Sequence, residues 1–190
     1  MKTKLIAPAL FLLLFISPLF AETVDVEYIQ LNRQMRTCVG VLYSPDICLT
    51  VGHLTDFVED EPVIIKRNRR AINGTIISIN QGADIAVVKL EKKLKVPTLP
   101  ISTGVNEGEE VFVDCFDRSR KMWLNGYGVE PLTDTKFLLF RGQTVELGMS
   151  GSPVYDGKGA LVSIVSGYLH DKDRRTIGCM PLNIKNIIGN

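Results

Sequence analysis

The chain has 190 residues, with 22 basic and 21 acidic side chains and two histidines. This near-neutral balance argues against a general nucleic-acid-binding protein, and the length suits one compact unit or two small lobes. Two histidines without a Cys-x-x-Cys pair argue against a zinc site, so no metal and no cofactor are expected.

Residues 1–21 have the layout of a signal peptide. Lys2 and Lys4 give a positive start, residues 5–20 are largely apolar, and Ala21 offers a small residue for cleavage before Glu22. A membrane anchor is the alternative, but the apolar run is short for a span. We therefore predict an exported protein, periplasmic or secreted, without membrane attachment once residues 1–21 are removed.

The remaining sequence alternates short apolar runs with Gly, Pro, Asn and Asp, which predicts an all-β fold. A connector at 94–101 contains two prolines and separates two sets of strands, so we expect lobes at 22–97 and 98–190. Many short strands are typical of a sandwich or of barrels, and a short helix is expected at 183–188. The predicted strands are 24–30, 37–43, 47–51, 62–66, 71–80, 84–90, 110–116, 122–129, 136–141, 153–155, 160–168 and 176–181.

The cysteines Cys38, Cys48, Cys115 and Cys179 allow three disulfide connectivities, and an exported protein can hold such bonds. A hairpin that turns at residues 45–46 does not place Cys38 opposite Cys48. Free, buried thiols are therefore the favoured interpretation, which is also the usual state of isolated cysteines.

Three motifs carry chemistry: Thr-Val-Gly-His53, Asp84-Ile-Ala-Val and Gly-Met-Ser150-Gly-Ser-Pro. A serine hydroxyl is a poor nucleophile unless a base lies within hydrogen-bond reach, and the base needs a third group that fixes its tautomer. His53 is the natural base, since imidazole titrates near neutrality, and Asp84 is the natural orienting group. Each residue alone has an ordinary structural explanation, but all three together predict a nucleophilic hydrolase.

The glycine before the serine also has a chemical role in this interpretation. An acyl-transfer site needs backbone N–H groups aimed at the oxyanion that develops during reaction. Gly148 can adopt conformations that a Cβ hinders, so its N–H and that of Ser150 are the expected oxyanion hole. Gly151 would let other groups pack close to the nucleophile.

With these motifs, the chain resembles the chymotrypsin/trypsin-like serine protease superfamily. The form Gly-x-Ser-Gly-Ser-Pro and the short spacings are most similar to a compact bacterial branch, which includes glutamyl endopeptidases and periplasmic quality-control proteases. The resemblance implies two six-stranded antiparallel β-barrels, with His53 and Asp84 from the first and Ser150 from the second. The matching segments are 49–53, 84–90, 96–100, 148–154, 159–166 and 177–183.

Two residues depart from the pattern of the digestive enzymes in this superfamily. Met149 stands where those enzymes have an Asp that pairs with a newly cut N-terminus, and Leu54 replaces a half-cystine next to the histidine. Activation by a new N-terminus should therefore be absent. Our hypothesis is that removal of residues 1–21 alone yields the active form, which a requirement for a further N-terminal cut would contradict.

The resemblance also implies a substrate pocket for a polypeptide. No Asp lies in the expected pocket base, which disfavours a preference for Arg or Lys, and Tyr168 would narrow the pocket toward small or medium apolar residues. Residues 166–168 would pair with the substrate backbone as a strand. The expected pocket residues are Thr144, Val145, Glu146 and Leu147 in its wall, Ser166, Gly167 and Tyr168 along the substrate, and Gly178 on the far side.

The other charged features are expected to be solvated. His170 is interpreted as an exposed loop residue, the basic runs 66–70 and 172–175 as hairpin tips, and the acidic run 59–61 as a turn without calcium-ligand spacing. Besides a serine endopeptidase, the sequence leaves open a catalytically silent peptide-binding relative and an esterase. A monomer is the default expectation.

Overall fold

The computed structural model of the chain describes residues 22–53, 62–67, 69–115, 118–130, 135–142, 146, 148–168 and 176–179. Within these residues it contains twelve β-strands and no helix, and each strand lies within a few residues of its predicted position. The all-β prediction is confirmed. The predicted signal peptide and the C-terminal helix at 183–188 lie outside the described residues.

The first six strands form a closed barrel in the order β1-β2-β3-β6-β5-β4. Every pairing is antiparallel, and alternate residues point inward, as the burial of Val24, Val26 and Tyr28 along the first strand shows. The strands are β1 (Thr23–Ile29), β2 (Met35–Ser44), β3 (Ile47–Thr50), β4 (Val63–Arg67), β5 (Arg70–Asn80) and β6 (Ile85–Leu90).

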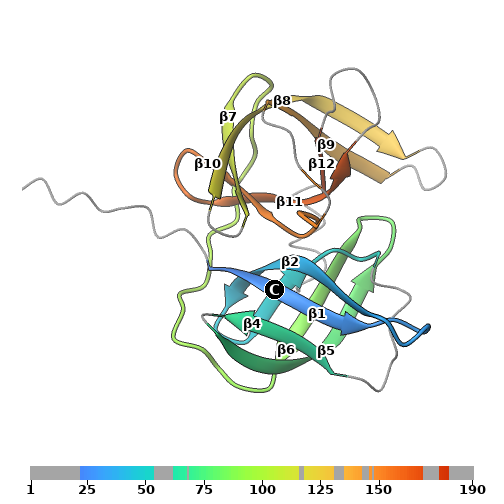
Figure 1. Cartoon of the computed structure of the whole chain (residues 1–190). Helices are drawn as coiled ribbons and strands as arrows, with labels where there is room; N and C mark the ends of the chain where they lie inside the picture. The colour runs from blue at the N-terminus through green and yellow to red at the C-terminus, as the bar shows by residue number, and fades with distance from the viewer. Residues whose placement is uncertain are drawn as a thin grey trace, which may run out of the picture.

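The last six strands form a second antiparallel barrel in the order β10-β11-β12-β9-β8-β7, in which β10 pairs back with β7. Figure 1 shows this barrel stacked on the first, with the connector running along one side between them (Figure 1). The strands are β7 (Glu110–Cys115), β8 (Arg118–Glu130), β9 (Thr135–Gly142), β10 (Pro153–Asp156), β11 (Leu161–Tyr168) and β12 (Thr176–Cys179).

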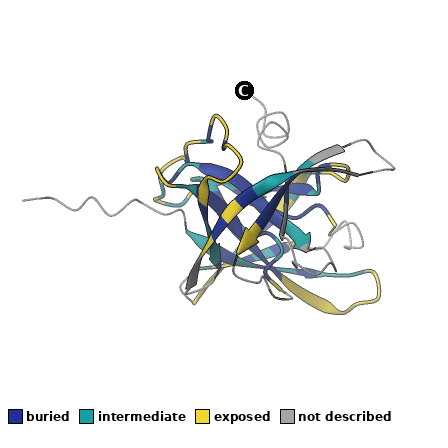
Figure 2. Ribbon diagram, turned by 90° about the horizontal axis from the view of Figure 1, so that it is seen from above, coloured by how far each residue is buried: buried dark blue, intermediate teal, exposed yellow. Residues whose placement is uncertain are grey.

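The two barrels share a hydrophobic cluster. Leu49, Ile85 and Val87 of the first barrel pack with Tyr155 and Leu161 of the second, and all five are buried. Buried residues fill the middle of the barrel strands, whereas hairpin ends are exposed (Figure 2). Burial of this shared apolar surface holds the barrels together, so groups carried by different barrels keep fixed relative positions.

The connector between the barrels is also anchored. Leu99 N–H donates to Tyr43 O (2.8 Å) in the first barrel, and Leu161 N–H donates to Pro100 O (2.8 Å) from the second. A parallel bridge between Ile101 and Leu161 follows. The proline-containing segment therefore links the barrels as an extended strap, in agreement with its extended-connector interpretation.

Cys38, Cys48 and Cys115 are buried thiols that form no disulfide. The turn at residues 45–46 pairs Cys48 with Leu42, so Cys38 does not lie opposite Cys48, as expected. Burial raises the pKa of the Cys38 thiol to about 11. The side chain of Cys179 lies outside the described part. In the described residues, no helix has the length and apolar character that a membrane crossing requires.

Candidate active site

His53 lies in a tight turn that follows β3. The turn packs so closely on the backbone at the start of β6 that a Cβ on Gly52 would come within 2.8 Å of Ile85 N. Only glycine allows this approach. The His53 N–H donates to Asp84 Oδ1 (2.7 Å), and its ring Nδ1 lies 3.0 Å from Asp84 Oδ2. Two contacts therefore fix the histidine on one carboxylate.

Asp84 ends the turn that leads into β6, and its backbone is left-handed, with φ of 54°. Asp tolerates this conformation better than most residues, and Asp84 N–H donates to Gln81 O (3.2 Å) within the turn. The turn directs the carboxylate toward the second barrel, where the Ser166 hydroxyl donates to Asp84 Oδ2. Asp84 therefore joins the two barrels.

Ser150 lies in the turn before β10, beside the strand that holds Ser166. Its hydroxyl donates to Ser166 O (3.2 Å), and Ser166 is the extra residue of a β-bulge in β11. The bulge lets one residue serve both neighbours, since its side chain bonds Asp84 while its carbonyl accepts from Ser150. The structure thus brings His53, Asp84 and Ser150 into one hydrogen-bond network, although within the described part of the chain no hydrogen bond joins Ser150 directly to His53.

A second tether fixes the backbone of Ser150 to the first barrel. Val39 N–H in β2 donates to Ser150 O (2.9 Å), and the Thr50 hydroxyl donates to Val39 O (2.7 Å). A Cβ on Gly151 would come within 1.8 Å of Val39 O, so Gly151 is required for this contact. Since the hydroxyl proton of Thr50 goes to Val39 O, the Cys38 thiol 3.2 Å away is the donor to Thr50.

The turn around Ser150 also presents backbone donors. Gly148 has φ of 89° and Gly151 has φ of 91°, both in the region that favours glycine. The N–H groups of Gly148 and Ser150 have no acceptor among the residues that the structure describes. Two unpaired backbone N–H groups next to a serine hydroxyl are what an oxyanion hole requires.

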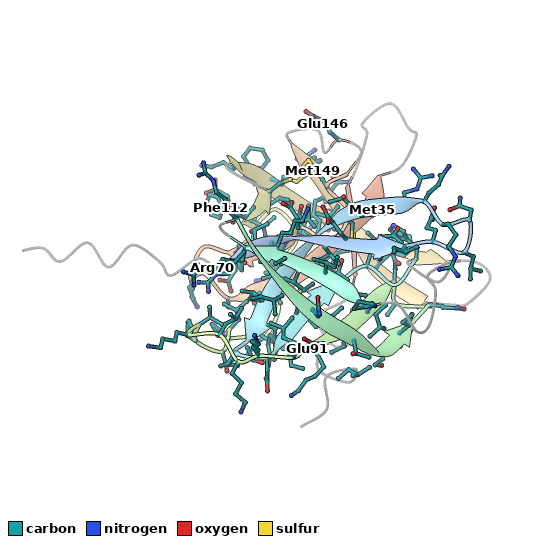
Figure 3. The ribbon with its side chains drawn as sticks, turned by 60° about the horizontal axis from the view of Figure 1, so that its bottom comes forward. Met35, Arg70, Glu91, Phe112, Glu146 and Met149 are labelled. Atoms are coloured by element: carbon teal, nitrogen blue, oxygen red, sulfur yellow. The ribbon has the colours of Figure 1, made fainter. Side chains whose placement is uncertain are left out.

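The buried side chain of Met149 fixes this turn to the hydrophobic core. It is 3% exposed and packs in the core of the second barrel with Val39. Its Sδ accepts a hydrogen bond from Glu146 N–H (3.2 Å), and its own N–H donates to Glu146 O (3.1 Å). Figure 3 shows Met149 and Glu146 together on one side of the molecule (Figure 3). A buried thioether therefore holds the segment that leads to Gly148.

The environment of His53 favours its protonated form. The hydrogen bond to Asp84 raises the pKa of His53, partial burial opposes this, and the negative charge of Asp84 adds to the increase. The His53 side chain is 52% exposed and that of Asp84 is 20% exposed, so solvent reaches the imidazole. In the neutral imidazole, with Nδ1 as the donor to Asp84, Nε2 is the acceptor and faces away from the carboxylate.

The predicted pocket residues have different outcomes. Ser166 and Gly167 are half-buried in β11. Gly167 and Tyr168 pair with β12, Ser166 is the bulge residue before them, and all three lie beyond the pairing of β11 with β10. Gly178 is buried, and the position of its missing Cβ faces Ser163 and Phe140. Thr144, Val145 and Leu147 lie outside the described residues, as do His170 and the acidic run 59–61. The roles of all these residues in binding stay predictions.

The sequence interpretation missed three contributors to this network. It predicts only a substrate contact for Ser166, yet this residue is a direct partner of Asp84. It does not single out Thr50 and Val39, although Thr50 belongs to the motif that ends in His53. A hydroxyl three residues before the histidine was the available signal. Among the described residues, no cluster of three His, Cys, Asp or Glu side chains is suited to a metal ion.

Comparisons with known proteins identify the family and the fold of the chain. The family model of the trypsin-like peptidase domain matches residues 38–164. The fold is similar to the active form of the Rv3671c protease from M. tuberculosis, with a TM-score of 0.75 and 17% identity over 88% of this chain and 79% of that one. No curated protein sequence matches at a significant level.

Two further similar structures are longer than this chain. The HtrA-type protease AlgW with a tripeptide has a TM-score of 0.71 and 16% identity, covering 87% of this chain and 58% of its own. The serine endoprotease from Yersinia pestis has a TM-score of 0.68 and 16% identity, covering 87% of this chain and 61% of its own. Since the family model matches well over half of the sequence, the chain belongs to the trypsin-like peptidase domain family of the chymotrypsin/trypsin-like serine protease superfamily.

Proposed function

We propose that the protein is an exported serine endopeptidase that hydrolyses peptide bonds through His53, Asp84 and Ser150. One observation carries this proposal: a single hydrogen-bond network links His53 and Asp84 of the first barrel to Ser166 and Ser150 of the second. The expected roles are base, orienting group and nucleophile, respectively. Gly148 and Ser150 supply the N–H groups of the oxyanion hole.

In the proposed reaction, the Ser150 hydroxyl leaves Ser166 O by rotation about χ1 and donates to His53 Nε2. Catalytic hydrogen bonds of this kind often form only when substrate is bound. Ser150 Oγ then attacks the carbonyl carbon of the scissile bond, and its proton passes to His53. The negative charge on the carbonyl oxygen is held by the N–H groups of Gly148 and Ser150.

Collapse of the tetrahedral intermediate completes the first half of the reaction. The C–N bond breaks, the imidazolium gives its proton to the leaving amine, and an ester of Ser150 remains. Water then gives a proton to His53 Nε2 and attacks the ester carbon, and Ser150 leaves with that proton. Asp84 stays ionised and stabilises the imidazolium in both halves.

The substrate proposal follows from β11. Gly167 and Tyr168 pair with β12 on one side, and among the described residues no strand pairs with the other side of residues 166–168, where an extended peptide would lie. We propose that Ser166, Gly167 and Tyr168 contact the substrate backbone, and that Thr144, Val145, Leu147 and Gly178 shape a pocket for small or medium apolar residues. Export and the removal of residues 1–21 as the only maturation step belong to the same proposal.

One observation favours a second candidate function. The Ser150 hydroxyl is bonded to Ser166 O, and the described residues hold no bond from it to His53. A protein that keeps this arrangement when a peptide lies along β11 would bind the peptide without cleaving it. The alternative is therefore a catalytically silent peptide-binding protein with a trypsin-like fold.

Labelling of the purified protein with a fluorophosphonate probe separates the two candidates. The peptidase proposal expects labelling of the unaltered protein and none of Ser150→Ala or His53→Ala. Thr103→Ala is the matched control, because it removes an exposed hydroxyl just after the connector and should label normally. No labelling of a chain that is folded by circular dichroism would overturn the peptidase proposal and favour the silent protein. If labelling occurs, an ester and a peptide library together distinguish an esterase from an endopeptidase.

A further inference from the structure

Two arginines face each other at one end of the first barrel. Arg67 of β4 pairs directly with Arg70 of β5, and the preceding pair on the same face is Ile65 with Ile72. Ile65 is fully buried and Ile72 is half-buried, so this face turns toward the barrel interior, and Arg70 lies exposed at the end of the barrel. Like charges directly opposite each other in an antiparallel pair destabilise a sheet, since their Cβ atoms are about 5 Å apart. The arrangement therefore calls for a compensating negative charge.

The chain compensates one of the two charges. Glu22 Oε2, just before β1, forms an ion pair with Arg67 Nε, and both side chains are partly shielded from solvent. Arg70 has no carboxylate partner among the residues that the structure describes. Within the described residues, therefore, only one guanidinium of the pair has a counter-charge, and its ion pair with Glu22 shows that a carboxylate fits at this end of the barrel.

A cavity of about 340 Å³ opens at this position. It is lined by Arg67, Arg70, Ile72 and Leu94. Ile72 and Leu94 are half-buried and pack against the core of the first barrel, and Leu94 is fixed by its N–H, which donates to Pro45 O (2.7 Å). The cavity combines two aliphatic side chains with two guanidinium groups, and none of the described residues that line it is acidic.

The cavity is separate from the candidate active site. The four described residues that line it take no part in the hydrogen bonds that join His53, Asp84, Ser150 and Ser166. Figure 3 shows Arg70 on a different part of the molecule from Met149, which adjoins Ser150 in sequence (Figure 3). Barrel mouths are common positions for small-ligand sites, which typically have volumes from about 300 Å³ upward.

We propose that this cavity binds a carboxylate that carries a short aliphatic group, such as the C-terminal residue of a peptide. The carboxylate would accept hydrogen bonds from the guanidinium of Arg70, with Arg67 adding positive charge. The aliphatic group would lie on Ile72 and Leu94. Arginine suits this task because its planar donors match the geometry of a carboxylate.

Calorimetric titration of the purified protein with N-acetyl-leucine tests this proposal, with N-acetyl-leucine amide and inorganic phosphate as comparison ligands. The acid is expected to bind more tightly than either comparison ligand. Arg70→Gln should weaken its binding about tenfold or more, which is the usual consequence of losing one charged hydrogen bond. Arg36→Gln, which removes the same charge from the exposed end of β2, should leave binding unchanged.

His53→Ala distinguishes this cavity from the candidate active site, where a carboxylate ligand can also bind. Binding that persists in His53→Ala and weakens in Arg70→Gln supports the cavity. The proposal is overturned if the acid and the amide bind equally, if phosphate binds as tightly as the acid, if His53→Ala abolishes binding, if Arg70→Gln leaves it unchanged, or if none of the ligands binds. These outcomes do not depend on whether the protein is a peptidase.

Discussion

At the level of single residues, the turn that carries Ser150 requires a residue without a Cβ at position 151. A Cβ at Gly151 would lie 1.8 Å from Val39 O, and the φ of 91° adds backbone strain. We expect Gly151→Ala to lower the free energy of unfolding by more than about 4 kcal/mol, the range of severe core disruption. Gly157→Ala is the control, because that position has open space around it. Urea denaturation measures both, and similar midpoints would contradict the expectation.

Asp84 supports a prediction about pH. Its hydrogen bond raises the pKa of His53, and only the neutral imidazole acts as a base. As the pH is lowered, kcat/KM should therefore begin to fall at a pH above the ordinary histidine pKa of about 6.5, because His53 becomes protonated there. Asp84→Asn should move this acid limb of the pH profile of kcat/KM to lower pH and should reduce kcat by about 10⁴-fold. In Asp46→Asn, which alters a carboxylate that contacts Ser44, Lys89 and Lys93, the acid limb should stay in place. An unmoved acid limb in Asp84→Asn would refute the assignment.

At the level of structural elements, the side chain of Met149 fixes the turn before β10. This residue is 3% exposed, and its sulfur accepts a hydrogen bond from Glu146 N–H. Met149→Asp should destabilise the protein by several kcal/mol, because it places a carboxylate in a cluster of buried apolar side chains. Met149→Leu keeps the apolar shape and should cost less than about 1.5 kcal/mol while lowering kcat through a looser oxyanion turn.

The control for the Met149 variants is Met35→Asp. Met35 is 60% exposed, so a carboxylate there remains hydrated and the melting temperature should change little. Thermal unfolding followed by circular dichroism gives the stabilities, and a labelling rate with fluorophosphonate gives the reactivity of Ser150. If Met149→Asp is as stable as Met149→Leu, the core contact of Met149 is not what holds the turn.

The strands could be predicted because alternating burial is written directly into the sequence, as in β1, where Val24, Val26 and Tyr28 face the core. The bulge at Ser166 could not, since a bulge depends on the register of two partner strands and not on a local pattern. For the same reason the sequence pointed to His53, Asp84 and Ser150 by residue type but not to Ser166 as the residue between them. The Val39 tether also rests on a long-range approach that no local motif encodes.

Across the molecule, the candidate site exists only where the barrels meet. His53 and Asp84 come from the first barrel, whereas Ser150 and Ser166 come from the second. The relative positions of these four residues are therefore fixed by the shared cluster, the connector and the Val39 tether. A side contact from Thr23 Oγ1 to Asp114 Oδ2 (2.8 Å) adds a polar link at the start of β1. These contacts predict that the barrels unfold together.

Leu161→Ala tests that cooperativity. Leu161 is fully buried in the shared cluster, and its truncation should cost about 2–5 kcal/mol. Two probes report separately: the fluorescence of Trp123 follows the second barrel, and alkylation of Cys48, which is fully buried, follows the first. In urea both midpoints should fall by the same amount, because loss of the common cluster destabilises one cooperative unit.

Ile77→Ala, at a position 57% exposed in β5, is the control for Leu161→Ala and should change the unfolding free energy reported by either probe by no more than a few tenths of a kcal/mol. If the Trp123 midpoint falls while Cys48 stays protected to the original urea concentration, the barrels unfold independently, and the positions of Ser150 and His53 are then coupled by their hydrogen bonds alone.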